Sequence, residues 1–432
     1  MKRLFRAILI LSVLGFLPAR PAYAENLTLS LEEAIRLALA HSHDALIAKA
    51  QARRAEEALR ETRSINLPRA SVGTGAAYNN GFPLSVEGSA PSIFRFDAVQ
   101  PIFSAQNRNL IREAEESARA ARIGSDIVDN ELAAQTAHLY FSLDQSRKAR
   151  PLKENILVEM QKRQELMEIE VEAGRARPID ARLARTEITA MEHEILTVGE
   201  QALLAEAELR ELTGLDAANS IITITPQMES PVYDMDAAAL FEKTAASSPE
   251  IIQAEAKIRA KEFHVEAEKA ERYPRIAAMA EYSMFSRSNN YEDYYSRFER
   301  HGYLVGISAQ IPLFDGFRSK ARVAQSREEL SAEQLNLRRL KSDMNRNIQK
   351  GLSAIRVARS EAAVAADGLE AEEDKLKIND ILFENGRVSE REMAVARADA
   401  LRKKLEMLDA EYNLYKQKLE LLRVTGSVLS VF

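Results

Sequence analysis

The sequence predicts a mainly α-helical fold with a small β part, in which a helix–hairpin–long helix unit occurs twice. Three observations predict this fold class. The 432 residues include only 16 glycines and 13 prolines, and 29% of them are charged, a composition that favours long helices. Two pairs of short segments alternate apolar and polar residues with the period of a β-strand. The landmarks around the first pair recur in the same order about 210 residues later.

The composition also excludes several kinds of functional site. The chain has no cysteine, so a disulfide framework, a thiolate zinc site, an iron–sulfur cluster and a cysteine nucleophile are all excluded. Its net charge of −6 speaks against a nucleic-acid partner. The length alone would suggest about three domains, but the repeated landmarks indicate one duplicated unit instead.

Residues 1–24 have the order of a secretory signal peptide. Lys2, Arg3 and Arg6 precede an apolar stretch over residues 7–17, and the small-x-small segment 22–24 offers a cleavage site. We therefore expect the protein to be exported, and we expect no lipid anchor because no cysteine follows that site. No later apolar run reaches the roughly 18 residues of a transmembrane helix, so any membrane insertion is expected to use β-strands.

The duplication follows from landmarks that occur in the same order in both halves. Pro68, Pro101, Gly174 and Thr213 have counterparts in Pro274, Pro312, Gly386 and Thr425. The predicted organisation is a first structural repeat over residues 25–215, an equatorial linker over 216–235 and a second structural repeat over 236–432.

Each repeat is expected to open with a helix. The first runs from about Ser30 to Ile65 as a single helix, and Ser30-Leu31-Glu32-Glu33 has the form of a capping box. Its counterpart runs from about Asp236 to Arg272, with Pro249 as a candidate break.

A β-hairpin follows each opening helix, over about residues 69–100 and about residues 275–311. In both hairpins the strands place apolar side chains on one face and small or polar side chains on the other, which is typical of transmembrane barrel strands. The apolar positions are Ala70, Val72, Phe94, Phe96, Ala98, Ile276, Ala278, Ala280, Tyr282, Met284, Tyr303, Val305, Ile307 and Ala309. A surface hairpin explains any single pair equally well.

The longest predicted helices follow the hairpins. About 70 residues separate Phe103 from Gly174, interrupted only by Pro151, and a helix of that length spans roughly 100 Å. After helical tips at about 174 and 386, the chain returns along heptad seams, which an antiparallel coiled coil would also produce. The seam residues are Ile188, Met191, Ile195, Val198, Ala202, Ala205, Leu209 and Leu212 in the first repeat, and Leu401, Leu405, Leu408, Tyr412, Tyr415, Leu419 and Leu422 in the second.

The strand count predicts an oligomer. Two strands in each repeat make four strands in the chain, and four strands cannot close a barrel, while open sheet edges are not tolerated in hydrocarbon. Three chains would supply twelve strands, an even number that closed barrels use. The same trimer would gather the long helices into a tube that continues from the barrel.

With these features the chain resembles the TolC family of outer-membrane efflux ducts. The resemblance covers the mature chain and rests on the duplicated unit, on the hairpin segments Ala70–Gln100 and Ile276–Ile311, and on tip turns at residues 171–174 and 383–386. It implies a homotrimer with a 12-stranded β-barrel in the outer membrane, in contact with lipid and continuous with a long periplasmic α-helical barrel. It also implies a periplasmic adaptor and an inner-membrane pump of the RND, ABC or MFS type, whose substrates the duct passes to the outside.

The resemblance further implies an acidic aperture at the periplasmic end. The family often places carboxylates six and nine residues after the second tip glycine. Glu392 matches the first position, whereas Val395 departs at the second. The candidate aperture residues are Glu392, Asp180, Arg391 and Arg387. The alternative is that Asp180 and Glu392 only stabilise the N-termini of their helices.

The same resemblance assigns the two tips to adaptor contact. The tip residues are Gly174, Arg175 and Ala176 in the first repeat, and Gly386, Arg387 and Val388 in the second. A glycine at a helix C-terminus also supplies the positive φ that such ends commonly need, and this explains both glycines without any partner.

Two rival functions were weighed. A periplasmic coiled-coil adaptor or scaffold without a pore would explain the signal peptide and the heptads, but not two amphipathic hairpins at equivalent positions. An enzyme is disfavoured because the histidines are scattered and no phosphate-binding loop or nucleophile motif occurs. No cofactor and no metal site are predicted.

Overall fold

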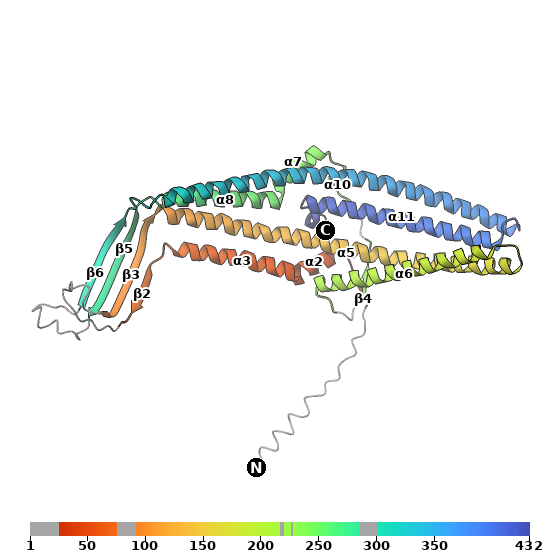
Figure 1. Cartoon of the computed structure of the whole chain (residues 1–432), viewed down its shortest axis with the longest axis horizontal. Helices are drawn as coiled ribbons and strands as arrows, with labels where there is room; N and C mark the ends of the chain where they lie inside the picture. Colours follow the sequence, from red (N-terminus) through yellow and green to blue (C-terminus); the bar gives the residue numbers. More distant parts are fainter. Residues whose placement is uncertain (1–25, 76–91, 217–219, 226–227, 286–300) are drawn as a thin grey trace, which may run out of the picture.

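The computed structural model describes residues 26–75, 92–216, 220–225, 228–285 and 301–432. The predicted signal peptide and the turns of both hairpins lie outside these residues. The molecule is elongated, with a β-sheet at one end and long helices that extend from the sheet to the opposite end (Figure 1). We call that opposite end the tip end.

Two very long helices run along the whole molecule. They are α5 (Ala105–Glu172, 68 residues) and α10 (Arg318–Glu384, 67 residues). Each turns at the tip end and returns as a shorter helix, α6 (Pro178–Thr213) or α11 (Glu390–Val424). The expected interruption at Pro151 is wrong, because α5 continues through it. The missing amide removes one helical hydrogen bond, and the packing of α5 against α3, α6, α8 and α11 supports the helix around this point.

The opening helix of the first half is not a single helix, which corrects the sequence-based expectation. It divides into α2 (Leu31–His41) and α3 (His43–Ser64) at Ser42, whose ψ of 136° is not helical. Ser42 donates its amide to the carbonyl of Ala38 and accepts the amide of Asp44 with its hydroxyl. One serine therefore ends the first helix and caps the second.

The corresponding helix of the second half breaks as expected beside Pro249. Here α7 (Ala237–Ser247) and α8 (Pro249–Ala270) meet at Ser248. The capping box expected at Ser30 is only half formed, because its hydroxyl accepts the amide of Glu33 while the Glu33 carboxylate bonds to Arg36 instead (3.3 Å).

The sheet contains four antiparallel strands in the order β2-β3-β5-β6. These are β2 (Arg69–Gly73), β3 (Ser92–Ser104), β5 (Arg275–Phe285) and β6 (His301–Gln310). The strands lie where the hairpins were predicted, except that β3 continues past residue 100. Its register with β5 shifts between Pro101 and Phe103, at a proline that cannot donate a ladder hydrogen bond.

The register confirms that the two faces of the sheet differ in polarity. Val72, Phe96, Tyr282 and Tyr303 lie opposite one another across all four strands, so they share one face. On the other face, Arg95 forms salt bridges with Asp97 (3.0 Å) and Glu281 (3.4 Å). One face is therefore apolar and the other is charged.

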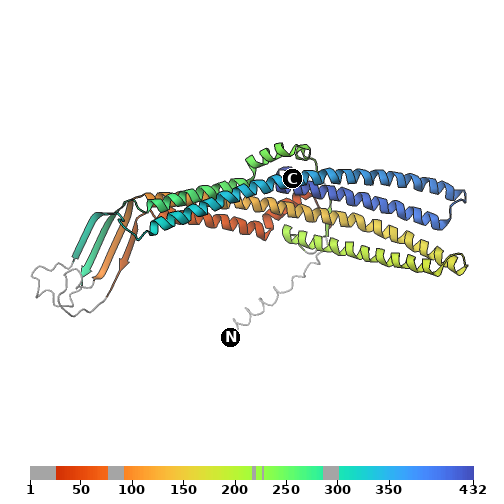
Figure 2. The ribbon, with the colours of Figure 1, turned by 45° about the horizontal axis from the view of Figure 1, so that its top comes forward.

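A small mixed region lies at the middle of the molecule, near the C-terminus of the chain (Figure 2). It contains the parallel strands β1 (Asn26–Leu29) and β4 (Ser220–Thr223), the short helix η1 (Pro231–Asp234) and α12 (Val428–Val431). The predicted linker, residues 216–235, contributes β4 and η1. The main hydrophobic core lies here, around residues such as Tyr140, Leu209, Ile221 and Leu421.

The heptad seams predicted for the returning helices face the interior of the chain. Ile188 and Met191 of α6 are buried against Ile156 and Met160 of α5, and Tyr412, Leu419 and Leu422 of α11 belong to the main core. Within the described residues, no helix is both long enough and apolar enough to cross a membrane.

Candidate functional site at the tip end

The two tips end their long helices in the same way. Gly174 and Gly386 have φ of 70° and 68°. The amide of Arg175 donates to the carbonyl of Glu170, and the amide of Arg387 donates to that of Leu382, both at 2.8 Å. With the shorter bonds made by the glycine amides, this is the Schellman arrangement, which requires a left-handed residue. The conformation of the helix ends therefore explains both glycines.

The other tip residues differ in how much of their surface is free. Arg175 and Arg387 are exposed, and neither side chain makes a hydrogen bond or a salt bridge within the described part of the chain. Ala176 and Val388 are half-buried. The molecule thus ends in two exposed arginines, one on each tip.

Glu392 is engaged in a capping box at the start of α11. Its amide donates to the Ser389 hydroxyl (3.2 Å), and its carboxylate accepts the Ser389 amide (2.8 Å). These bonds from Ser389 hold the pKa of Glu392 below its usual value. The helix-capping alternative raised by the sequence therefore describes what Glu392 does within one chain, and the carboxylate remains charged and exposed.

Asp180 lies in the first turn of α6 and is held by a different partner. The Arg177 guanidinium donates two hydrogen bonds to its carboxylate, at 2.8 and 3.0 Å. This charged pair lowers the pKa of Asp180. Asp180 is therefore ionised but already neutralised by its neighbour.

Arg391 connects the two halves of the chain near the tips. Its guanidinium lies 3.4 Å from the carboxylate of Glu170 on α5. One position earlier, Glu390 forms a salt bridge with Lys162 of α5 (2.8 Å). Two ion pairs thus join the start of α11 to α5.

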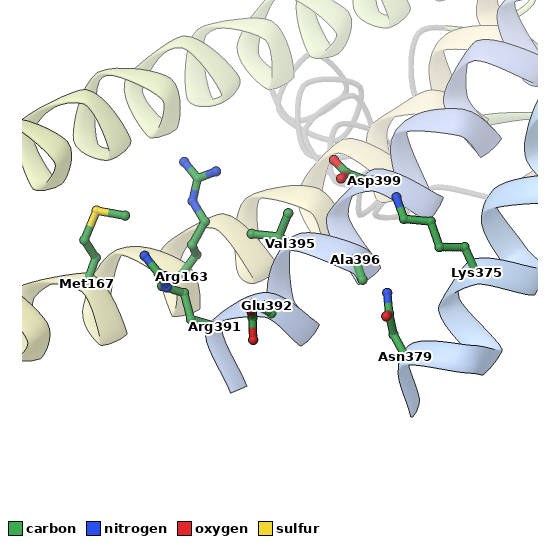
Figure 3. A pocket seen from close by; sticks show the side chains of 9 residues that line it. All are labelled: Arg163, Met167, Lys375, Asn379, Arg391, Glu392, Val395, Ala396 and Asp399. Carbon is green, nitrogen blue, oxygen red and sulfur yellow. The ribbon is translucent and has the colours of Figure 1, made fainter. Parts of the chain in front are cut away.

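Glu392 and Arg391 also line a groove of about 430 Å³ between α5, α10 and α11. Figure 3 shows that α5 contributes Arg163 and Met167, that α10 contributes Lys375 and Asn379, and that α11 contributes Arg391, Glu392, Val395, Ala396 and Asp399. Val395, where the family pattern has a carboxylate, lies in the wall of this groove, and Asp399 follows one turn later. Asp180 does not line it.

A buried polar cluster in the middle of the molecule was not foreseen from the sequence. The Asp144 carboxylate accepts hydrogen bonds from Thr223 and Thr225 (both 2.8 Å), from Lys148 (3.1 Å) and from Tyr412. Burial acts to raise the pKa of Asp144, but these hydrogen bonds outweigh it and lower the pKa. The cluster ties α11 and the segment after β4 to α5.

A second buried carboxylate holds β4 in place. Glu206 of α6 accepts hydrogen bonds from Arg147 of α5 (2.8 Å) and from the amide of Ile221 (3.0 Å). Within the described residues, no group of three or more histidine, aspartate or glutamate side chains is arranged to hold a metal ion. The polar clusters of the middle region are therefore connections between elements.

Known proteins share both the sequence pattern and the fold. The sequence model of the outer membrane efflux protein family matches residues 34–215 and 240–427. The chain is 22% identical over 327 residues to the outer membrane efflux protein BepC of Brucella suis biovar 1, covering 74% of this chain and 69% of BepC.

Solved structures extend the likeness to the fold. The outer membrane protein VceC of Vibrio cholerae is similar with a TM-score of 0.75 and 17% identity, over 92% of this chain and 96% of VceC. The CmeC outer membrane channel of Campylobacter jejuni gives a TM-score of 0.74 and 14% identity, over 92% of this chain and 85% of CmeC. The expected membership of the TolC group of proteins is confirmed. Because the family model covers most of the sequence, this chain belongs to the outer membrane efflux protein family, whose members are transport channels and not enzymes.

Proposed function

We propose that this chain forms, as a homotrimer, the outer-membrane exit duct of a tripartite efflux or secretion system. The sheet would lie in the outer membrane and the helices would extend into the periplasm. Substrates would pass through the duct from an inner-membrane pump and a periplasmic adaptor to the outside.

The observation that carries this proposal is the order of elements at three levels of the molecule. The sheet has the order β2-β3-β5-β6. Beside it, contacts order the helices as α3, α5, α8 and α10, and in the tip half as α6, α5, α11 and α10. Each level is thus four elements wide and has two edges. Three copies joined edge to edge would close twelve strands and twelve helical columns.

The sheet supports a membrane position because of its two unlike faces. Tyr303, Val305 and Ile307 on β6 are exposed by 73% or more. Such an apolar face would be stable against lipid, and the face with Arg95, Asp97 and Glu281 would line a wet lumen. The unpaired backbone groups of β2 and β6 would find their partners in neighbouring copies.

The helices at the edges carry apolar side chains that have no partner within the chain. On α6 these are Leu183, Leu196, Leu203 and Leu204, and on α10 they are Val357, Val364, Ile378 and Ile381, each exposed by 56–69%. Seven residues separate Leu196 from Leu203 and Val357 from Val364, as in a coiled-coil seam. We propose that the α6 stripe of one copy packs against the α10 stripe of the next.

We also propose that the two halves of the chain arose by duplication. The order of helix pair, strand pair, long helix and returning helix occurs over residues 31–213 and again over 237–424. The two segments matched by the family model correspond to these halves.

The aperture would lie at the tip end. Three copies of Glu392, and of Asp180, would gather negative charge around one axis and attract cations. Arg391, Arg387 and the salt bridge to Glu170 would hold the closed state against the repulsion between these charges. The exposed tips, Gly174-Arg175-Ala176 and Gly386-Arg387-Val388, would contact the adaptor.

Conductance across planar lipid bilayers tests this function. The purified full-length protein is expected to insert from detergent and to produce discrete single-channel steps of small conductance. The rival reading, a coiled-coil adaptor or scaffold without a pore, predicts a water-soluble protein that produces no steps. That result would refute the proposed function.

A further inference from the structure

Exposed apolar side chains collect where the sheet joins the helices. They are Leu67, Ile102, Phe103, Tyr273, Leu313, Phe314 and Phe317, exposed by between 46% and 94%. The most exposed of them lie in the segment between β6 and α10, with Leu313 at 94% and Phe314 at 78%. We call residues 311–320 the junction segment.

Phe317 in this segment adopts a conformation that phenylalanine disfavours. Its φ is +67°, the only positive φ of a non-glycine residue among those described, and it follows Gly316 at +68°. A bulky residue in the left-handed region costs about 1–3 kcal/mol. Its ring is 71% exposed and contacts Phe314 edge-on at 5.7 Å. Burial within the chain therefore does not offset the strain, which points to a contact outside the chain.

Two cations lie beside these rings. Arg272 and Lys320 line the same shallow cavity of about 350 Å³ as Leu313, Phe314 and Phe317. Both are exposed, and neither makes a hydrogen bond or a salt bridge within the described residues. The nearby Asp315 carboxylate, in contrast, accepts the amide and hydroxyl of Ser319.

The neighbouring arginines are already paired. Arg318 and Arg322 both reach Glu271, at 3.4 Å. Arg272 and Lys320 are therefore the cations at this cavity that remain available for an external anion, next to an apolar surface. Aromatic rings combined with available cations are the chemistry that recognises a membrane interface with anionic headgroups.

The distribution of the apolar side chains favours lipid over a second copy of the chain. A neighbouring copy would cover the edge strands β2 and β6. Ile102, Phe103 and Tyr273, however, lie at the ends of the central strands β3 and β5, whose neighbours are strands of the same chain. The exposed belt thus crosses the full width of the sheet, as the boundary of a bilayer would.

We propose that the junction segment, together with Arg272, binds the surface of a bilayer that contains anionic phospholipid. Arg272 and Lys320 bind headgroup phosphates, and Phe314 and Phe317 insert beside the glycerol and upper acyl region. The inference rests on the proposed function, since it places the sheet in the membrane.

The first test compares vesicles of phosphatidylcholine with and without phosphatidylglycerol, each holding the full-length protein. The melting temperature of the wild type is expected to rise with phosphatidylglycerol, and the rise is expected to shrink in high salt. The double variant Arg272→Gln/Lys320→Gln should lose the rise. The matched control Arg338→Gln/Arg339→Gln, which removes two exposed charges from the middle of α10, should retain it.

The second test uses Phe317→Gly, which relieves the backbone strain. In detergent without lipid, the melting temperature of this variant is expected to be higher than that of the wild type, whereas its retention in vesicles is expected to be lower. A lower melting temperature in detergent, or dissociation of the oligomer there, would show that the ring packs within the protein and would overturn the proposal.

The outcomes separate this inference from the function on which it rests. If the wild type enters both kinds of vesicle with equal melting temperatures, or if the control loses the rise as fully as the Arg272/Lys320 variant, only the present inference fails. If the wild type enters neither kind of vesicle, the proposed function fails and this inference fails with it.

Discussion

At the scale of single residues, Glu392 combines a structural and an electrostatic role. Its carboxylate accepts the Ser389 amide while the Ser389 hydroxyl accepts the Glu392 amide. The capping box thus fixes where the charge lies, and the bonds that lower its pKa keep it ionised at neutral pH. The two roles can be separated by substitution, because glutamine also completes a capping box.

Glu392→Gln is expected to reduce the cation selectivity of the channel with little change in stability. Ser389→Ala should retain the charge and the selectivity but destabilise the start of α11 by about 1 kcal/mol. Reversal potentials in a salt gradient measure the selectivity, and thermal melting measures the stability. Equal reversal potentials for wild type and Glu392→Gln would remove Glu392 from the aperture.

Asp144 is expected to make stability depend on pH. Its pKa is lower in the folded protein than in the unfolded chain, so its contribution is complete above the unfolded value near 3.8 and is lost as the pH falls through the folded value. Asp144→Asn weakens the bonds from Thr223, Thr225 and Tyr412 and should destabilise the protein by about 1–3 kcal/mol at neutral pH. It should also flatten the loss of stability in acid.

Chemical denaturation at a series of pH values measures this dependence. Thr186→Val provides the matched control, since it removes an exposed side-chain bond to the backbone of α6. An Asp144→Asn profile parallel to the wild-type profile in acid would contradict the assignment.

The sequence revealed some of these residues and concealed others for a physical reason. The tip glycines and Glu392 act through bonds to residues at most five positions away, so their local pattern is visible in the sequence. Asp144 binds Thr223 and Tyr412, which are 79 and 268 positions away. Only the folded arrangement of α5, β4 and α11 brings these groups together.

At the scale of elements, two salt bridges fasten α11 to α5 near the tips. They join Lys162 to Glu390 and Arg391 to Glu170. Both are partly exposed, so each contributes at most about 1 kcal/mol to stability. Their larger effect would be on the position of α11 at the aperture.

The double variant Lys162→Gln/Arg391→Gln is therefore expected to increase single-channel conductance while changing the melting temperature little. The control Arg346→Gln removes an exposed pair with Asp343 on α10, away from the tips, and should leave the conductance unchanged. An unchanged conductance in the double variant would show that these bonds do not restrain the aperture.

Elements could be predicted where periodicity decides them. The period of two identified both faces of the sheet, because the register confirms the opposition of Val72, Phe96, Tyr282 and Tyr303. The break at Ser42 was missed because a one-residue cap leaves the apolar pattern on either side of it undisturbed. The continuity of α5 through Pro151 was missed because tertiary packing, which periodicity does not contain, overrides a local preference.

At the scale of the whole molecule, the account depends on open edges at the sheet and at the helices. Leu203→Lys/Leu204→Lys places charges on the proposed seam of α6 and is expected to separate the trimer while each chain keeps its helical content. Glu200→Lys, at another exposed position of α6, serves as the control and should leave the oligomer intact. Sedimentation and circular dichroism report the two properties separately, and an intact oligomer in the double variant would contradict the seam.

The central claim is that one chain supplies one third of a closed duct. The mass of the detergent-solubilised protein, determined by light scattering with the detergent contribution subtracted, tests it most directly. The account predicts a single species of three chains. A homogeneous species of one chain would contradict it, because four strands with two open edges cannot form a barrel alone.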